Sequence, residues 1–201
     1  MKPEKRKGRF IVIYAANNLG KSVQVTNLAV KLIEAGHQVL KIKYPIYQLE
    51  PTGPAINKGL RIDTSISELA LQKLFARNRR DFQKTIITLL NAGIDIIAED
   101  YKGTGIAWGM TRGIKLELLE KINANLIEPD LSILLDGKRF ISKIEKGHRN
   151  EDLDQTEWEK SRSMHKLLGK RYGWKNVNAN QSIYEVSEDI WKIVSKAFSA
   201  S

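Results

Sequence analysis

The segment Gly20-Lys21-Ser22 follows an apolar run at 10–14 and precedes a stretch of helical periodicity at 21–35. A buried strand, a tight loop and a helix in this order predict an α/β unit. Gly-Lys-Ser in such a loop is typical of a phosphate-binding loop, where backbone N–H groups and a helix N-terminus face the anion. We expect Lys21 to be a solvent-side ligand of the outer phosphates of a nucleotide, and the Ser22 hydroxyl to bind Mg²⁺.

The match to a phosphate-binding loop is incomplete. Ala15 stands where the usual pattern has a glycine, and Asn17 and Asn18 also depart from a glycine-rich loop. A Cβ at Ala15 is expected to crowd a loop that often needs unusual backbone angles. The alternative is an ordinary strand-to-helix turn with a surface lysine.

Composition narrows the class of protein. The chain has 201 residues, which fits one domain (1–201), and it has no cysteine, which excludes disulfides and thiolate metal sites. Its three histidines show no metal-ligand spacing, and no apolar run approaches the length of a membrane span. With no signal-peptide pattern at the start, we expect a cytoplasmic protein without a membrane partner.

The net charge is +10, and part of the excess lies in a basic N-terminal tail at about 1–8. Such a tail is usually solvated, although it could touch nucleic acid. Lysines and arginines would equally serve to hold a polyanionic substrate. We expect no nucleic-acid partner, but the charge alone does not decide.

Periodicity predicts strands alternating with helices. The strands are expected at 10–14, 38–42, 94–98, 131–135 and 176–178, and the helices at 21–35, 65–76 resuming through 82–90, 115–125, 154–172 and 182–198. Residues 44–54 are predicted to be loop, because they hold three prolines and a glycine. The pattern predicts a parallel sheet with helices on both faces and a ligand site at the carboxyl ends of the strands.

Short motifs follow one another along nearly the whole chain. They are Gly20-Lys21-Ser22, Glu50-Pro51-Thr52-Gly53, Leu74-Phe75-Ala76-Arg77-Asn78-Arg79, Asp100-Tyr101, Thr104-Gly105-Ile106-Ala107-Trp108, Pro129-Asp130-Leu131 and Leu134-Leu135-Asp136. Their order and spacing resemble the thymidylate kinase family. The resemblance implies a P-loop NTPase-type nucleoside monophosphate kinase fold with a short lid, ATP and Mg²⁺ as cofactors, and a homodimer.

The resemblance also implies roles for individual residues. ATP would be bound by Leu19, Gly20, Lys21, Ser22, Val23 and Asn180. The acceptor dTMP would be bound by Arg61, Phe75, Arg79, Tyr101 and Trp108, with Arg61 and Arg79 on its phosphate and Phe75 stacked on thymine. Spacing alone favours the alternative that Phe75 is a core residue of an amphipathic helix.

Glu99 and Asp100 lie where the family has an Asp-Arg pair, so Asp100 puts a negative charge in place of a cation. That reversal is costly beside nucleotide phosphates unless a metal or another cation compensates. We expect both carboxylates to act through Mg²⁺, together with Ser22. The alternative is a capped strand end with solvated carboxylates.

A cation near the transferring phosphoryl group is also expected. The basic segment 137–151 follows a strand and resembles the family's lid, so Arg139 and Arg149 are the candidates for an arginine finger. With Lys21 and Glu99, they make up the expected catalytic residues. The alternative for this segment is a basic, solvent-facing helix.

The sequence thus favours transfer of a phosphoryl group from ATP to dTMP, which gives ADP and dTDP. Three alternatives stay open: a catalytically weakened homologue that acts as a nucleotide sensor or scaffold, a kinase for a different nucleoside monophosphate, and a nucleic-acid-associated protein that uses the basic tail.

Overall fold

The structure, a computed structural model, describes residues 7–63, 65–141 and 144–199. Its strands form a single sheet: β1 (Phe10–Tyr14), β2 (Val39–Lys43), β3 (Asp95–Glu99), β4 (Leu131–Asp136) and β5 (Lys175–Asn178). The strand order is β2-β3-β1-β4-β5, and all neighbouring strands are parallel. The predicted α/β fold is therefore confirmed.

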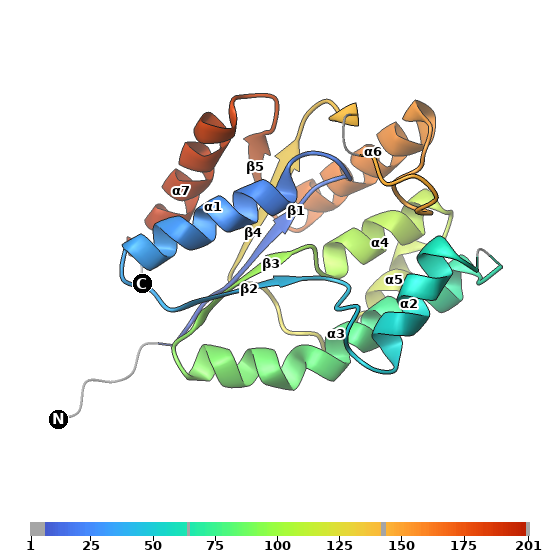
Figure 1. Ribbon diagram of the computed structural model, residues 1–201, viewed down its shortest axis with the longest axis horizontal. Helices are drawn as coiled ribbons and strands as arrows, with labels where there is room; N and C mark the ends of the chain where they lie inside the picture. Colours follow the sequence, from blue (N-terminus) through green and yellow to red (C-terminus); the bar gives the residue numbers. More distant parts are fainter. Residues whose placement is uncertain (1–6, 64, 142–143, 200–201) are drawn as a thin grey trace.

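The helices are α1 (Lys21–Glu34), α2 (Thr52–Arg61), α3 (Glu68–Asn91), α4 (Lys102–Thr111), α5 (Leu116–Ile122), α6 (Gln155–Arg171) and α7 (Ile183–Ser199). As Figure 1 shows, α1 and α7 cover one face of the sheet, while α3 and α6 lie on the other. Helix α4 packs against both α3 and α6. Among the described residues, no helix is both long and apolar enough to cross a membrane.

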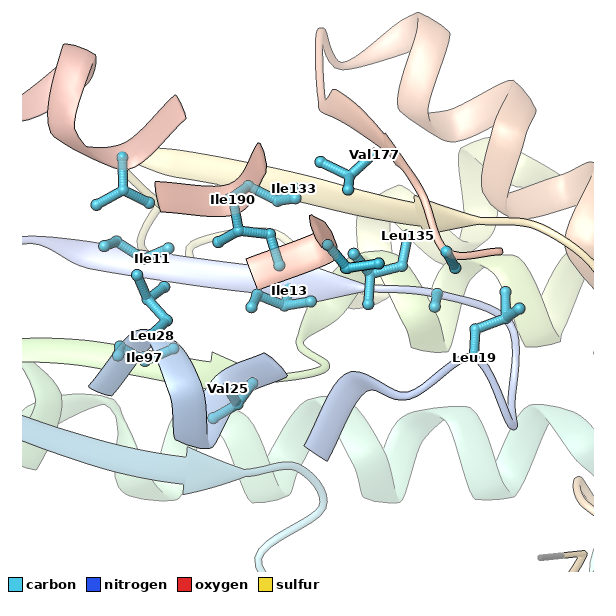
Figure 2. Close-up of a cluster of buried hydrophobic side chains, with 14 of the residues drawn as sticks. Ile11, Ile13, Leu19, Val25, Leu28, Ile97, Ile133, Leu135, Val177 and Ile190 are labelled. Atoms are coloured by element: carbon cyan, nitrogen blue, oxygen red, sulfur yellow. The ribbon is translucent and has the colours of Figure 1, made fainter. Parts of the chain in front are cut away.

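The central strand β1 supplies both halves of the core. All five of its residues are buried, as expected for a parallel strand covered on both faces. Ile11 and Ile13 point toward the apolar faces of α1 and α7 (Figure 2), whereas Phe10, Val12 and Tyr14 belong to the cluster under α3. This packing fixes the direction of β1 and therefore the position of the loop that follows it.

The prediction of loop through 44–54 is wrong at its end, because α2 begins at Thr52. Pro54 occupies the first turn of that helix, where a backbone N–H has no intrahelical partner to lose. Proline therefore marks the start of a helix here.

Helix α4 is absent from the predicted elements because its three glycines lower its helix propensity. Packing explains at least one of them. A Cβ on Gly103 would lie 2.5 Å from the ring of Trp174, so a larger residue would push α4 away from its neighbours. Tertiary contact outweighs local propensity in this segment.

The two helical stretches predicted at 65–76 and 82–90 are one continuous helix, α3. The apolar pattern is interrupted at Asn78 and Arg79, although both side chains are buried. Asn78 accepts a hydrogen bond from the Ile46 backbone N–H at 2.9 Å. Polar residues therefore sit on the buried face of α3, which made the helix look broken in the sequence.

Two further expectations concern less regular segments. The described parts of 137–151, which are 137–141 and 144–151, contain no α-helix, so the alternative of a basic helix is wrong for them. Most of the basic tail at 1–8 lies outside the described residues.

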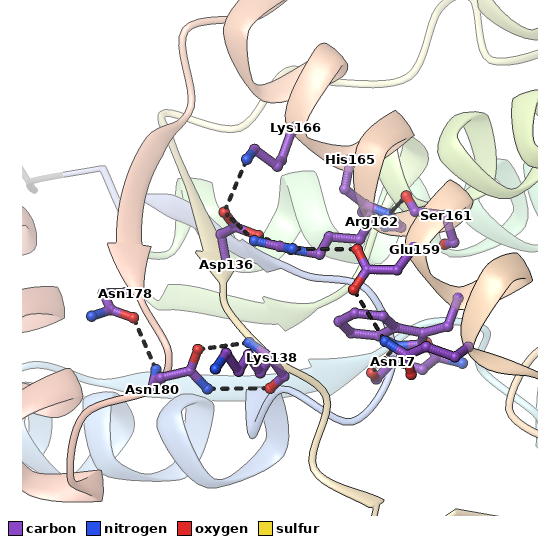
Figure 3. A network of polar contacts seen from close by, with 12 residues as sticks. Asn17, Asp136, Lys138, Glu159, Ser161, Arg162, His165, Lys166, Asn178 and Asn180 are labelled. Atoms are coloured by element: carbon purple, nitrogen blue, oxygen red, sulfur yellow. Dashed lines mark hydrogen bonds and ion pairs between the residues drawn. The ribbon is translucent and has the colours of Figure 1, made fainter.

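A polar cluster holds α6 to the end of β4 (Figure 3). Arg162 donates to Asp136 from Nε at 2.6 Å and from Nη2 at 3.3 Å, and Lys166 Nζ lies 3.5 Å from the same carboxylate. Burial alone would raise the pKa of Asp136, but the hydrogen bonds and charges of Arg162 and Lys166 outweigh it and hold that pKa below its ordinary value. The cluster therefore stabilises the fold most when Asp136 is ionised.

Replacing Asp136 by asparagine should lower the free energy of unfolding by about 1–3 kcal/mol at neutral pH, because Arg162 loses its charged acceptor. A folded-state pKa below the unfolded value means that the unfolded chain binds more protons. The difference between wild type and Asp136→Asn should therefore be complete above about pH 4 and shrink as the pH falls through the lowered pKa. Urea unfolding of both proteins from pH 6 to 3 measures it, and a difference that does not change with pH would contradict this account.

Candidate active site

The loop after β1 leads directly into α1. The first turn of α1 has no acidic residue, which would repel an anion. The positive φ angles of the loop fall at Asn18 (62°) and Gly20 (81°), and not at Ala15, which is fully buried. Asparagine and glycine are the residues that adopt this left-handed conformation most readily. The crowding expected at Ala15 is therefore not seen, and the N-terminus of α1 is accessible to an anion.

Lys21 lies buried beneath this loop, with 7% of its surface exposed. Its ammonium group donates to the carbonyls of Ala15 at 3.2 Å and Ala16 at 3.4 Å, and lies 3.7 Å from Asp100 Oδ1. The expectation of a solvent-side lysine is therefore wrong for this conformation. Phosphate oxygens accept stronger hydrogen bonds from an ammonium group than backbone carbonyls do. Lys21 can therefore exchange a carbonyl partner for a phosphate of a bound ligand.

Glu99 and Asp100 lie at the carboxyl end of β3, next to the loop. Glu99 is the last residue of the strand and pairs with Lys43 at 2.8 Å. Asp100 follows with φ of 63° and accepts a hydrogen bond from Thr104 Oγ1 at 2.7 Å. Burial raises the pKa of Asp100, Lys21 opposes this and Glu99 adds to it. The pKa of Asp100 is raised overall, so Lys21 offsets only part of the cost of its buried charge.

These groups open onto one cavity of about 360 Å³ at the carboxyl ends of β1, β2 and β3. Its lining joins the loop, the two carboxylates and a group of aromatic residues: Asn17, Asn18, Gly20, Lys21, Ser22, Val23, Lys43, Tyr44, Pro45, Tyr47, Leu60, Phe75, Arg79, Glu99, Asp100, Thr104, Gly105, Trp108, His148, Asn150 and Glu151. The position is the one where open parallel sheets bind ligands.

Helices α3 and α4 form another part of the cavity wall. The ring of Phe75 and the guanidinium of Arg79 lie side by side, with the guanidinium carbon 6.0 Å from the ring centroid. Arg79 is 4% exposed, donates to Asn123 Oδ1 at 2.9 Å, and keeps a buried Nε with no hydrogen-bond partner. Burial lowers the pKa of Arg79. A ligand or a water molecule that accepted a hydrogen bond from Nε would remove the cost of this unused donor.

A second cavity of about 470 Å³ lies between α4, α5 and the 172–174 turn. It contains no residue of the loop 15–20 and neither Glu99 nor Asp100. We therefore place the active site in the first cavity.

Comparison with known proteins gives the family. The sequence model described as "Thymidylate kinase" matches residues 16–190. The chain is 28% identical to a thymidylate kinase of Dictyostelium discoideum, covering 96% of this chain and 87% of that protein. It is 32% identical to a probable thymidylate kinase of Pyrococcus abyssi, with 94% and 96% covered. The solved thymidylate kinase of Candida albicans superposes with a TM-score of 0.81 at 24% identity, covering 94% of this chain and 92% of that one, which supports the fold.

The chain belongs to the thymidylate kinase family. The resemblance noted in the motifs is thereby confirmed, and the family's proteins are nucleoside monophosphate kinases. The structure brings together several of the residues that the resemblance singled out. Within one cavity lie Gly20, Lys21, Ser22, Val23, Phe75, Arg79, Glu99, Asp100 and Trp108.

Other residues that the thymidylate kinase resemblance singled out lie elsewhere. Tyr101 is 1% exposed and packs its ring on those of Phe10 and Tyr44, as a core residue. The side chain of Leu19 is buried in the core, so only its backbone faces the loop. Asn180 clamps the backbone of Lys138, accepting from its N–H at 2.6 Å and donating to its carbonyl at 3.2 Å (Figure 3).

Arg61, expected on the acceptor phosphate, does not line the cavity. Its Nε and Nη2 donate to the two carboxylate oxygens of Glu145 at 2.6 and 3.1 Å, and its guanidinium lies over the ring of Tyr47. The bidentate pair joins the end of α2 to the lid segment, which we define as residues 137–151. Arg61 is therefore engaged in a structural ion pair with Glu145 and does not face the cavity.

The two lid arginines are also engaged. Arg139 donates to the carbonyls of Leu153 and Glu151, and its Nη2 lies 3.5 Å from Asn18 Oδ1 in the phosphate-binding loop. Arg149 donates to the Ile66 carbonyl at 2.9 Å, away from that loop. Of the two, Arg139 is the one that lies beside the expected phosphates.

The lid segment and the phosphate-binding loop are joined by further contacts. Asn17 Nδ2 donates to the Asn150 carbonyl, and the Phe140 N–H donates to the Asn18 carbonyl at 2.9 Å. The indole N–H of Trp158 donates to the Asn17 carbonyl at 2.8 Å. The residues that replace the family's loop pattern therefore serve as attachment points for the lid.

Three lid side chains could in principle hold a metal, because the ligand atoms of Glu145, His148 and Glu151 lie within 4.8 Å of one another. Glu145 is already held by Arg61, and His148 Nδ1 accepts the Asn150 N–H. We assign no metal to this cluster.

Lys43 and the lid residues His148, Asn150 and Glu151 line the cavity but are absent from the site residues expected from the sequence, as is Asn123, which accepts from Arg79. Lys43 directly follows the strand predicted at 38–42, and its place at a strand end is a signal that could have been used. A Cβ on Gly105 would lie 2.7 Å from Arg79 Nη2, a close approach that only the folded structure reveals.

The pair formed by Lys21 and Asp100 should be visible in stability. Lys21→Met leaves Asp100 buried beside Glu99 without its cation and should destabilise the protein. Asp100→Asn leaves Lys21 unpaired but also removes a carboxylate whose pKa is raised by burial, so it should cost less. The double variant should recover part of the loss, with a coupling free energy of about 0.5–3 kcal/mol. Chemical unfolding of the four proteins without ligand measures this, and strictly additive effects would show that the two side chains do not interact.

Proposed function

We propose that this protein is a thymidylate kinase that transfers the γ-phosphoryl group of ATP to dTMP, giving ADP and dTDP. One observation carries the proposal: a single cavity is lined both by the loop after β1, with Lys21, and by the pair Phe75 and Arg79. A donor phosphate would lie at the loop and an acceptor base at the aromatic ring. A catalytically weakened sensor is not favoured, because the loop angles at Asn18 and Gly20 are ones those residues adopt readily.

The donor nucleotide would lie over the loop and the start of α1. The backbone N–H groups of Gly20, Lys21 and Ser22 and the positive end of the helix would bind its phosphates. Lys21 would leave the Ala15 carbonyl and donate to the outer phosphates. Val23, which is 42% exposed at the cavity wall, would contact the bound nucleotide.

The acceptor base would stack on Phe75, beside Trp108. Arg79 would complete its hydrogen bonds on the base, since its burial next to Phe75 suits the base end of the cavity better than the phosphate end first expected. Asn123 orients the guanidinium: its Oδ1 accepts from Arg79, and its Nδ2 donates to the Leu119 carbonyl at 2.9 Å. Phosphoryl transfer depends on such positioning more than on covalent chemistry.

The donor set near the phosphates consists of hard oxygen ligands, namely the hydroxyl of Ser22 and the carboxylates of Glu99 and Asp100, all on the same cavity. This set fits Mg²⁺, which binds through a few carboxylates, phosphates and water. When bound there, Mg²⁺ would neutralise charge that develops on the phosphoryl oxygens. Glu99 and Asp100 would hold the ion, and Lys21 would hold the outer phosphates against it.

Arg139 is the proposed arginine finger, because its guanidinium lies beside Asn18 of the loop. Arg149 would instead keep the lid segment attached to α3 through its ion pair with Glu68 at 3.3 Å. The homodimer that the family resemblance implies is part of this proposal, and sedimentation of the purified protein tests it.

The proposed reaction is tested with a coupled assay for ADP release. Wild-type protein with ATP, Mg²⁺ and a panel of nucleoside monophosphates should give turnover that is fastest with dTMP. Lys21→Ala serves as the inactive control, since it removes the cation of the phosphate-binding loop. Fast turnover with another monophosphate would change the acceptor, and ATP binding without any turnover would support a sensor.

Arg79 should control the acceptor alone. Arg79→Met keeps much of the buried volume but removes the donors, so the KM for dTMP should rise about tenfold to a hundredfold. The KM for ATP should change little, because Arg79 lies on α3 beside Phe75 and belongs neither to the loop after β1 nor to α1. Steady-state kinetics with each substrate varied in turn measures both constants. Equal changes in both would remove Arg79 from the acceptor site.

A further inference from the structure

Lys43 is the last residue of β2 and lies beside the end of β3. The parallel register pairs Lys43 with Glu99, and the Lys43 Nζ lies 2.8 Å from Glu99 Oε1. The lysine side chain is 59% exposed, whereas the glutamate is 8% exposed, and both line the active-site cavity. The ammonium group is thus tethered at the cavity wall and accessible from the cavity.

The ammonium has capacity for a ligand. A lysine ammonium has three N–H donors, and Glu99 takes one of them. Glu99 is in contact with the ammonium, and Asp100 and Glu151 line the same cavity. Lys43 therefore keeps N–H donors available for an anion in the cavity.

The cavity has few other cations for an acceptor phosphate. Among the described lining residues, the lysines and arginines are Lys21, Lys43 and Arg79. Lys21 lies under the loop that would bind the donor phosphates, and Arg79 is buried beside Phe75. Arg61 is held by Glu145 outside the cavity lining. An acceptor phosphate that lies between the loop and Phe75 would meet Lys43.

The carboxylates make such a cation necessary. Glu99, Asp100 and Glu151 line the same cavity, so a dianionic phosphate entering it meets three negative charges. Lys21 offsets Asp100, and Lys43 is the cation beside Glu99. Without Lys43, no cationic side chain among the described lining residues would lie beside Glu99 to meet the acceptor phosphate.

We propose that Lys43 binds the phosphate of the acceptor monophosphate. Glu99 would hold the Nζ of Lys43 in place during binding. Lys43 would thus replace Arg61, which the family resemblance places on the acceptor phosphate. The inference rests on the proposed function, because it concerns the acceptor of the same reaction.

The test is Lys43→Gln, with Lys41→Gln as the matched control. Lys41 lies two residues earlier on β2 and donates to Thr26 on α1, and it does not line the cavity. Lys43→Gln should raise the KM for dTMP about tenfold, the effect of removing a charged partner of phosphate, with the KM for ATP nearly unchanged. Lys43→Arg should restore most of the affinity, and Lys41→Gln should behave as wild type.

A binding measurement separates this inference from the proposed function. The thermal stabilisation given by dTMP should fall in Lys43→Gln, whereas that given by thymidine, which lacks the phosphate, should not change. Equal stabilisation of wild type and Lys43→Gln by dTMP would overturn the inference and leave the kinase proposal standing. A wild-type protein that binds dTMP in this Lys43-dependent way but does not phosphorylate it would support the inference and contradict the reaction.

Discussion

The parallel pairing of β1 with β3 is the constraint on which the site depends. The register sets Ile13 opposite Glu99, and the Asp100 N–H donates to the Ile13 carbonyl at 3.1 Å just beyond. The loop that follows β1 and the carboxylates that end β3 must therefore meet at one edge of the sheet. Because β1 is buried on both faces, it cannot slip or tilt without exposing apolar surface. The positions of Lys21 and Asp100 follow from this pairing.

The departures of this chain from the usual family motifs have physical counterparts. The left-handed backbone of the loop is carried by Asn18 and Gly20, which leaves Ala15 in an ordinary buried position. The Asn17 side chain donates a hydrogen bond to the Asn150 carbonyl of the lid segment. Asp100 replaces a cation but lies beside Lys21, so the charge reversal is partly offset within the protein. The altered residues form a connected arrangement, as a working site requires.

Much of this could be predicted from the sequence, since buried parallel strands read as continuous apolar runs and Gly-Lys-Ser follows the first of them. Helix α4 could not, because its glycines argue against a helix and only packing against neighbours such as Trp174 explains them. The pairing of Lys43 with Glu99 could not either, because the two residues meet only through the register of two strands far apart in the chain. Local patterns gave the elements, and long-range contacts decided which side chains share the cavity.

A crystal structure of the protein with ADP, Mg²⁺ and dTMP tests the central claim most directly. The account predicts that the ADP phosphates lie over the backbone N–H groups of Gly20, Lys21 and Ser22, and that Lys21 has moved from the Ala15 carbonyl to a phosphate. The thymine ring should stack on Phe75. Nucleotide bound instead in the cavity between α4 and α5, with Lys21 still on the Ala15 carbonyl, would contradict it.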